Sequence, residues 1–113
     1  MTSMRTYIDQ TRSMQQEIHA LAKAKGWWDQ QRNNGELIAL IHSELSECLE
    51  ALRHGNPPDD KLSEFLGAEV ELADAVIRIM DMAEARGWRL AEAIVAKHKF
   101  NRSREYRHGG KRF

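Results

Sequence analysis

The sequence predicts an all-α protein, a chain of four helices that assembles into helical bundles. Apolar residues recur at spacings of three and four in four separate segments, which is the period of a helix face. Turns containing glycine or proline separate the middle segments, and no stretch alternates as a strand would. At 113 residues, 42% hydrophobic and 30% charged, the chain has the composition of one soluble globular domain. We expect a helical domain over residues 1–106 and a basic arm over residues 107–113.

The first helix is predicted over residues 3–25 and stops at Gly26. His19 lies one position from its apolar stripe, so we expect a hydrogen-bonded boundary histidine rather than a ligand contact. The loop that follows carries Trp27 and Trp28. Because adjacent side chains point in different directions, we expect one tryptophan to cover the core and the other to offer a stacking surface to a planar ligand.

The middle of the chain predicts two antiparallel helices, over residues 35–54 and 61–86. The segment between them is rich in Gly, Asn, Pro and Asp, and it is short enough to make the helices neighbours. Each helix carries an acidic pair at i,i+3 spacing, and such a pair projects from one helix face. The carboxylates expected to converge are those of Glu44, Glu47, Glu71 and Asp74.

These four carboxylates repel one another unless a cation neutralises them. Oxygen-only ligands favour Mg²⁺ over zinc, with Mn²⁺ as an alternative, and the Glu-x-x-His motif of di-iron centres is absent from the sequence. Spacing alone equally allows ordinary solvated charges, some of them paired with Arg78. Glu50, one turn beyond Glu47, is either an extra ligand or a solvated side chain.

The apolar arc of the third helix is wider than one neighbouring helix needs, so we expect part of it to be buried against other helices or a second subunit. The only cysteine, Cys48, lies on the apolar face of the second helix and is expected to be a small core residue. The residues of the arc are Phe65, Leu66, Leu72, Val76, Ile79, Met80 and Ala83.

The fourth helix is predicted over residues 89–106, where Lys97 and Asn101 lie one turn apart and face the same way. The net charge of zero hides a segregation. Residues 44–84 hold eleven acidic and three basic side chains, whereas residues 97–113 hold seven basic and one acidic. A negative centre with a positive tail suits a metal site that takes an anionic ligand. The blander account is a basic tail that touches nucleic acid or is simply mobile, and we do not expect nucleic acid as a partner.

The N-terminus lacks the apolar segment of a signal peptide. No apolar run approaches the roughly 18 residues of a membrane span. We therefore expect a cytoplasmic protein that makes no membrane contact.

Four motifs, in this order, resemble the MazG-like nucleoside triphosphate pyrophosphohydrolases of the all-α type. The resemblance covers roughly residues 17–113 and rests on the Trp27-Trp28-Asp29 loop, residues 43–51 (Ser-Glu-Leu-Ser-Glu-Cys-Leu-Glu-Ala), residues 71–74 (Glu-Leu-Ala-Asp) and Lys97-x-x-x-Asn101-Arg102. It implies Mg²⁺-dependent hydrolysis of a (deoxy)nucleoside triphosphate to the monophosphate and pyrophosphate, as in nucleotide-pool house-cleaning.

The resemblance also assigns roles to residues. It makes Glu44, Glu47, Glu71 and Asp74 the catalytic metal ligands. It implies that Lys97, Asn101 and Arg102 contact the phosphates and that Trp27 or Trp28 contacts the base or sugar. Ser43, just before the first motif glutamate, does not accept a proton readily, so a ligand carboxylate such as Glu47 or the metal ions alone must activate water.

The same family is implied to form a homodimer or a homotetramer. Two other functions stay open at this point. One is a non-catalytic helical oligomer whose basic tail binds nucleic acid. The other is a phosphoribosyl-ATP pyrophosphohydrolase, which would use the carboxylates in the same way.

Overall fold

The computed structural model describes residues 2–104 and 112 and confirms the all-α class. Among these residues no strand forms, and Pro58 and Leu66 make an isolated antiparallel bridge. No helix in this part of the chain is long and apolar enough to cross a membrane. The four helices are α1 (Thr2–Ala24), α2 (Asn34–Arg53), α3 (Gly67–Arg86) and α4 (Leu90–Arg102).

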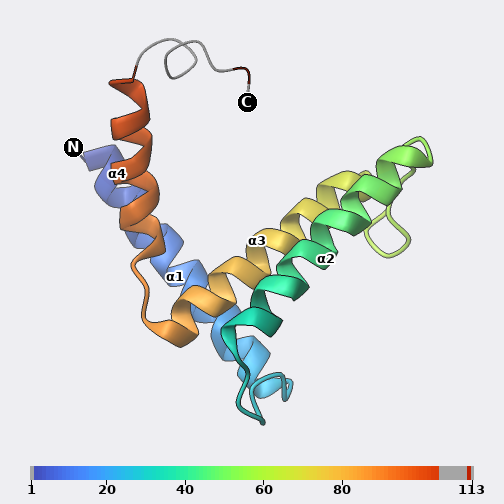
Figure 1. Ribbon diagram of the computed structural model, residues 1–113, viewed down its shortest axis with the longest axis horizontal. Coiled ribbons are helices and arrows are strands. Elements are labelled where there is room, and N and C mark those ends of the chain that lie inside the picture. The colour runs from blue at the N-terminus through green and yellow to red at the C-terminus, as the bar shows by residue number, and fades with distance from the viewer. Residues whose placement is uncertain (1, 105–111, 113) are drawn as a thin grey trace.

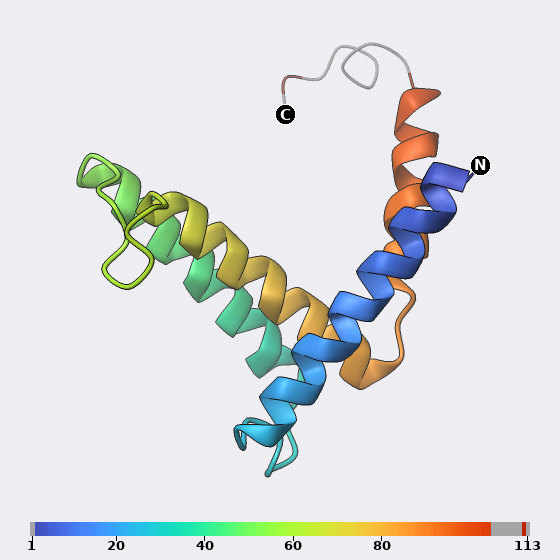
Figure 2. The same cartoon turned by 180° about the vertical axis from the view of Figure 1, so that it is seen from behind.

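The helices form an open shape rather than a closed bundle. α2 and α3 lie side by side along their length, α1 crosses one end of α3, and α4 lies beside α1 (Figures 1 and 2). The α2–α3 pair extends to one side of this crossing and α4 extends to the other (Figure 1). The radius of gyration is 16.6 Å, against about 13 Å expected for a compact domain of this length. The single chain therefore leaves much of its helical surface uncovered.

Local signals explain the ends of α1 and α2, which fall within one residue of the predicted bounds. Gly26 adopts a left-handed backbone conformation (φ 87°) just past the end of α1. The Asn33 side chain accepts a hydrogen bond of 2.8 Å from the Glu36 backbone N–H and so caps the N-terminus of α2.

The predicted start of the third helix at residue 61 is wrong, because α3 begins six residues later at Gly67. The Asp59 carboxylate accepts backbone N–H bonds from Lys61 and Leu62, at 3.0 and 2.9 Å, which closes a turn instead of starting a helix. The chain then returns to Pro58, and the Leu66 backbone N–H donates to Glu69 Oε1 (2.8 Å) at the entry to α3. Phe65 and Leu66 therefore lie before the helix and outside its apolar arc.

The fourth helix is also shorter than predicted, since α4 ends at Arg102. The Ser103 hydroxyl donates to the Phe100 carbonyl (2.6 Å), which satisfies one of the last carbonyls of the helix. Residues 103 and 104 form a turn and a bend instead of continuing the helix. Residues 105–106 of the predicted helix and nearly all of the basic arm over residues 107–113 lie outside the described residues.

The core within one chain is small. Cys48 is buried at 7% exposure, and its Sγ lies 3.7 Å from the Ala68 carbonyl on α3, which confirms it as a core residue. No large side chain is fully buried in the described part of the protein. The buried apolar residues are Leu37, Cys48, Ala68, Ala75, Met82, Ala83 and Ala91.

One face of the α2–α3 pair is apolar and exposed. On each helix three large apolar side chains follow an i, i+4, i+7 pattern, and each is between 37% and 53% exposed. Since the helices are antiparallel and both series are offset by one residue from the buried contacts, the two series project from the same side of the pair. We call this surface the apolar face: Leu45, Leu49 and Leu52 of α2 with Leu72, Val76 and Ile79 of α3.

Candidate metal centre

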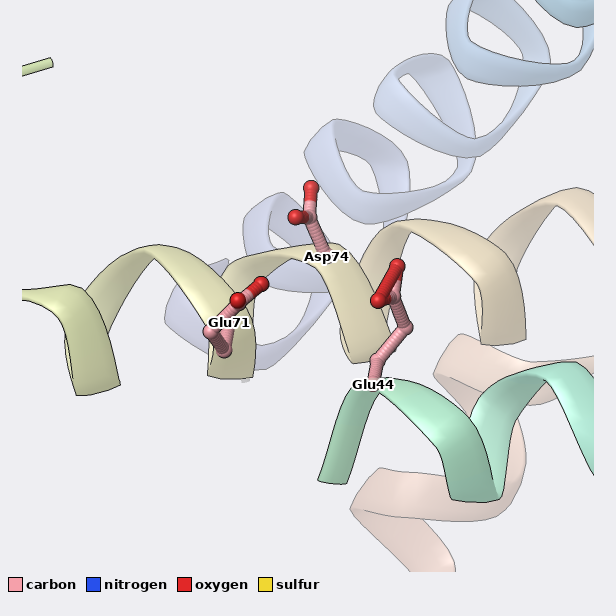
Figure 3. Close-up of side chains that lie close together, drawn as sticks. All are labelled: Glu44, Glu71 and Asp74. Carbon is pink, nitrogen blue, oxygen red and sulfur yellow. The ribbon is translucent and has the colours of Figure 1, made fainter. Parts of the chain in front are cut away.

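Three of the four predicted carboxylates come together between α2 and α3. Glu44 of α2 and Glu71 and Asp74 of α3 each offer a carboxylate oxygen, and these oxygens lie within 4.8 Å of one another (Figure 3). All three side chains are half-buried. We call this group the acidic cluster.

The helix register creates the acidic cluster. Glu44 lies one turn before buried Cys48, so it projects from the face of α2 that packs on α3. Glu71 lies one turn before buried Ala75, and Asp74 lies beside it at i+3. The i,i+3 motif on α3 thus reaches across to the glutamate on α2.

The donor set of the acidic cluster fits a hard divalent cation. Mg²⁺ takes oxygen ligands at roughly 2.0–2.1 Å, so opposite ligands lie about 4.2 Å apart. Oxygens that already lie within 4.8 Å need only small side-chain rotations to meet that spacing. Carboxylates, unlike thiolates or imidazoles, select Mg²⁺, Mn²⁺ or Ca²⁺.

Electrostatics in the acidic cluster also favour a cation. Burial raises the pKa of the Glu71 carboxyl above its ordinary value. The hydrogen bond with Asp74 raises this pKa further, as do the negative charges of the other three motif carboxylates. The ionised form of Glu71 is therefore disfavoured in the protein without metal, and a bound cation would reverse that penalty.

Glu47, the fourth predicted ligand, is exposed and lies outside the group of converging oxygens. Its charge still reaches the acidic cluster, since it contributes to the raised pKa of Glu71. Glu50 is a solvated side chain that forms ion pairs with Arg53 and His54 at 3.8 and 3.2 Å. Ser43 donates its hydroxyl to a backbone carbonyl of its own helix at 2.6 Å.

Arg78 lies beside the acidic cluster. The sequence indicated that Arg78 could pair with a carboxylate but did not identify the partner. Its Nε donates to Glu44 Oε2 at 3.1 Å, so it pairs across the helices rather than with Asp74 on its own helix. The Arg78 and Glu44 side chains are 33% and 16% exposed. This pair depends on the register of α2 against α3, which cannot be read from the residue spacing within either helix.

A cavity of about 320 Å³ opens beside the acidic cluster. Glu44, Asp74, Arg78, Trp27 and Arg32 are among the residues that line it. Trp27 is 59% exposed, so its ring is available to a molecule in the cavity. Of the two tryptophans, Trp27 is therefore the candidate for the predicted stacking surface, which stays a prediction.

Trp28 is held by the protein itself. Its Nε1–H donates to both carboxylate oxygens of Asp81, at 3.0 and 3.1 Å. His19 Nδ1 lies 2.7 Å from Asp81 Oδ1, and its ring meets Trp28 edge-on at 5.2 Å between centroids. This network joins α1, the tryptophan loop and α3, so His19 is the hydrogen-bonded boundary residue that was predicted. Sequence reasoning missed Asp81, whose role depends on the packing of α1 against α3.

The residues predicted to contact phosphates lie on α4, away from the acidic cluster of the same chain. α4 packs against α1 and extends away from the α2–α3 pair (Figures 1 and 2). Lys97 Nζ lies 4.8 Å from the Phe100 ring centroid, and Asn101 and Arg102 are exposed on the last turn. A single chain therefore does not bring Lys97, Asn101 or Arg102 to the carboxylates.

Comparisons of this chain with protein-family models, with curated proteins and with solved structures give no match. The resemblance to the MazG-like enzymes rests on its motifs alone, and membership of that family stays a prediction.

Proposed function

We propose that this protein is a Mg²⁺-dependent nucleoside triphosphate pyrophosphohydrolase that acts in nucleotide-pool house-cleaning. The observation that carries the proposal is the convergence of Glu44, Glu71 and Asp74 within 4.8 Å, beside a cavity bordered by Trp27. Hydrolysis at the α-phosphorus needs a cation site, a surface for the nucleoside and positive charge for the leaving pyrophosphate. The acidic cluster and the neighbouring cavity would supply the first two within one chain.

Glu44, Glu71 and Asp74 would hold Mg²⁺ or Mn²⁺. The cation, when bound, polarises phosphate oxygens and makes a bound water more acidic. Glu47 lies one turn from Glu44 on α2 and is exposed, so it is the proposed fourth ligand or proton acceptor. Its position at the edge of the acidic cluster leaves it accessible to the water that attacks.

The cavity supplies the surface for the nucleoside. Trp27 offers a ring face on which a base can stack. Lys25 and Arg32 line the same cavity and attract an anionic substrate. The Trp28–Asp81 hydrogen bonds fix the loop that carries Trp27, so the stacking surface is set before substrate binds.

The phosphate contacts assigned to α4 require a second copy of the chain in this proposal. α4 extends away from the acidic cluster of its own chain, so Lys97, Asn101 and Arg102 would reach the cluster of another copy in a homodimer or homotetramer. Surface area supports assembly. The chain exposes 8897 Å², whereas a compact monomer of its mass exposes about 6,300 Å². The excess is roughly 2,600 Å² per chain, or about 5,200 Å² for a pair, which is at the upper end of the total area that obligate interfaces bury.

A substrate panel tests the proposed function. We expect pyrophosphate release from at least one ribo-, deoxyribo- or modified nucleoside triphosphate in the presence of Mg²⁺. Phosphoribosyl-ATP belongs in the panel, because the same carboxylates would serve that substrate. Asp74→Asn removes a ligand charge without changing shape and should abolish release, whereas Glu50→Gln, which alters a solvated carboxylate on α2, should leave it intact. Release that survives in Asp74→Asn would exclude the proposed metal site.

A further inference from the structure

One positive side chain contacts the acidic cluster. Arg78 reaches from α3 to α2, where its Nε donates to Glu44 Oε2 at 3.1 Å. Both side chains are at least two-thirds covered, so the pair is screened less than a surface ion pair. Glu44 is also one of the three proposed metal ligands. In the proposed function the same carboxylate would therefore have two competing cationic partners.

A guanidinium and a divalent cation cannot share this carboxylate without strong repulsion. Charges of the same sign a few ångströms apart repel strongly where the surroundings are partly dehydrated. Repulsion from a metal ion on Glu44 would weaken the Arg78 contact, and we expect it to displace the guanidinium. Arg78 borders the cavity that also contains Trp27 and Asp74, so the displaced guanidinium has a space to enter.

We propose that Arg78 exchanges partners at the acidic cluster. It pairs with Glu44 until a divalent cation binds, and it then turns into the cavity to contact the phosphates of the substrate. This inference rests on the proposed function, since it assumes that the cluster takes a metal ion. Arg78 thereby neutralises one of the carboxylates, Glu44, in the metal-free protein and supplies a phosphate contact from the same chain, which α4 does not.

Metal affinity without nucleotide tests the exchange. We expect Arg78→Gln to bind Mn²⁺ about tenfold more tightly than the wild type, because the competing charge is gone. Arg53→Gln is the matched control, since Arg53 also pairs with a glutamate of α2 but is 66% exposed and lies outside the cluster. Its affinity should equal that of the wild type. Isothermal titration calorimetry with MnCl₂ measures all three.

Thermal stability keeps the test valid if Arg78→Gln folds poorly. Saturating Mg²⁺ should raise the melting temperature of Arg78→Gln by roughly 5 °C more than that of the wild type, because the metal takes over the neutralising role. A variant that is unfolded without metal should regain its helical circular dichroism when Mg²⁺ is added. An unfolded state that persists in Mg²⁺ would overturn the exchange.

Steady-state kinetics test the proposed contact between the released Arg78 guanidinium and the substrate phosphates. Arg78→Gln should raise KM for the nucleoside triphosphate by about tenfold, while Arg78→Lys, which keeps the charge, should recover part of that loss. Tighter metal binding combined with weaker substrate binding is the signature of the exchange. An unchanged KM would overturn the phosphate contact.

The two proposals fail in different ways. Equal Mn²⁺ affinity in Arg78→Gln and the wild type would overturn the exchange and leave the metal site standing. Binding by neither protein would overturn both proposals. Binding by Arg78→Gln alone would support the exchange in its strongest form, in which Arg78 blocks the site.

Discussion

The apolar face leads to a specific prediction for Leu49, which lies at its centre and is 50% exposed. Full burial of a leucine side chain is worth roughly 1.5–3 kcal/mol, so covering the exposed half contributes about 1 kcal/mol. A two-fold dimer contains each site twice. Leu49→Ala should therefore weaken the dimer by about 2 kcal/mol, or about 30-fold in Kd. Leu49→Lys should weaken it further, because an ammonium group would be buried without a partner.

Sedimentation velocity at micromolar concentration measures this effect. We expect the wild type to sediment as a dimer or tetramer and Leu49→Lys to sediment as a monomer or to precipitate. Met14→Lys is the matched control, since Met14 is 51% exposed but lies on α1, outside the apolar face. A wild type that is a well-behaved monomer, or a Leu49→Lys variant that stays fully assembled, would refute the assignment of this face as an interface.

Three further predictions concern the site and its surroundings. The pKa of Glu71 is raised in the metal-free fold, so its contribution to stability is present below the ordinary glutamate pKa and is lost as pH rises through the raised pKa. The melting temperature of the metal-free protein should therefore fall as pH rises over that window. Glu71→Gln should remove this fall. Asp81→Asn should cost about 1.5–3 kcal/mol in unfolding free energy, measured by urea titration, because the Trp28 indole loses a charged acceptor; a loss below 0.5 kcal/mol, on the order of an ordinary surface change, would contradict this role. Lys97→Ala should lower kcat/KM by roughly tenfold to a thousandfold at low salt, whereas Lys99→Ala should cost little; equal kinetics would remove Lys97 from the site.

The sequence contains enough to predict the helices that have clear stops. α1 and α2 end at glycine-containing turns and were predicted within one residue. The start of α3 was predicted six residues too early, because Asp59 accepts the backbone N–H bonds of Lys61 and Leu62 in a single turn that does not continue as a helix. The return of the chain to Pro58, which limits that turn, is a tertiary contact that local patterns do not contain.

In the candidate site too, features set within one helix were predictable and features set by tertiary packing were not. Glu71 and Asp74 lie on the same face of one helix because they are three residues apart, and this spacing can be read directly from the sequence. The Arg78–Glu44 pair joins two helices, and Trp28 with Asp81 joins a loop to α3. These pairings depend on the register and the crossing angles of the helices, which are set by loop geometry and packing. Sequence therefore predicts the carboxylates of the site better than the residues that hold or neutralise them.

Hydrolysis in water enriched in heavy oxygen tests the central claim most directly. A nucleoside triphosphate accepted by the wild type is turned over with Mg²⁺ and again with a chelator, and mass spectrometry locates the label. We predict heavy oxygen in the nucleoside monophosphate and none in the pyrophosphate, with turnover only when Mg²⁺ is present. Label in pyrophosphate or inorganic phosphate, or equal turnover with the chelator, would contradict metal-dependent attack at the α-phosphorus.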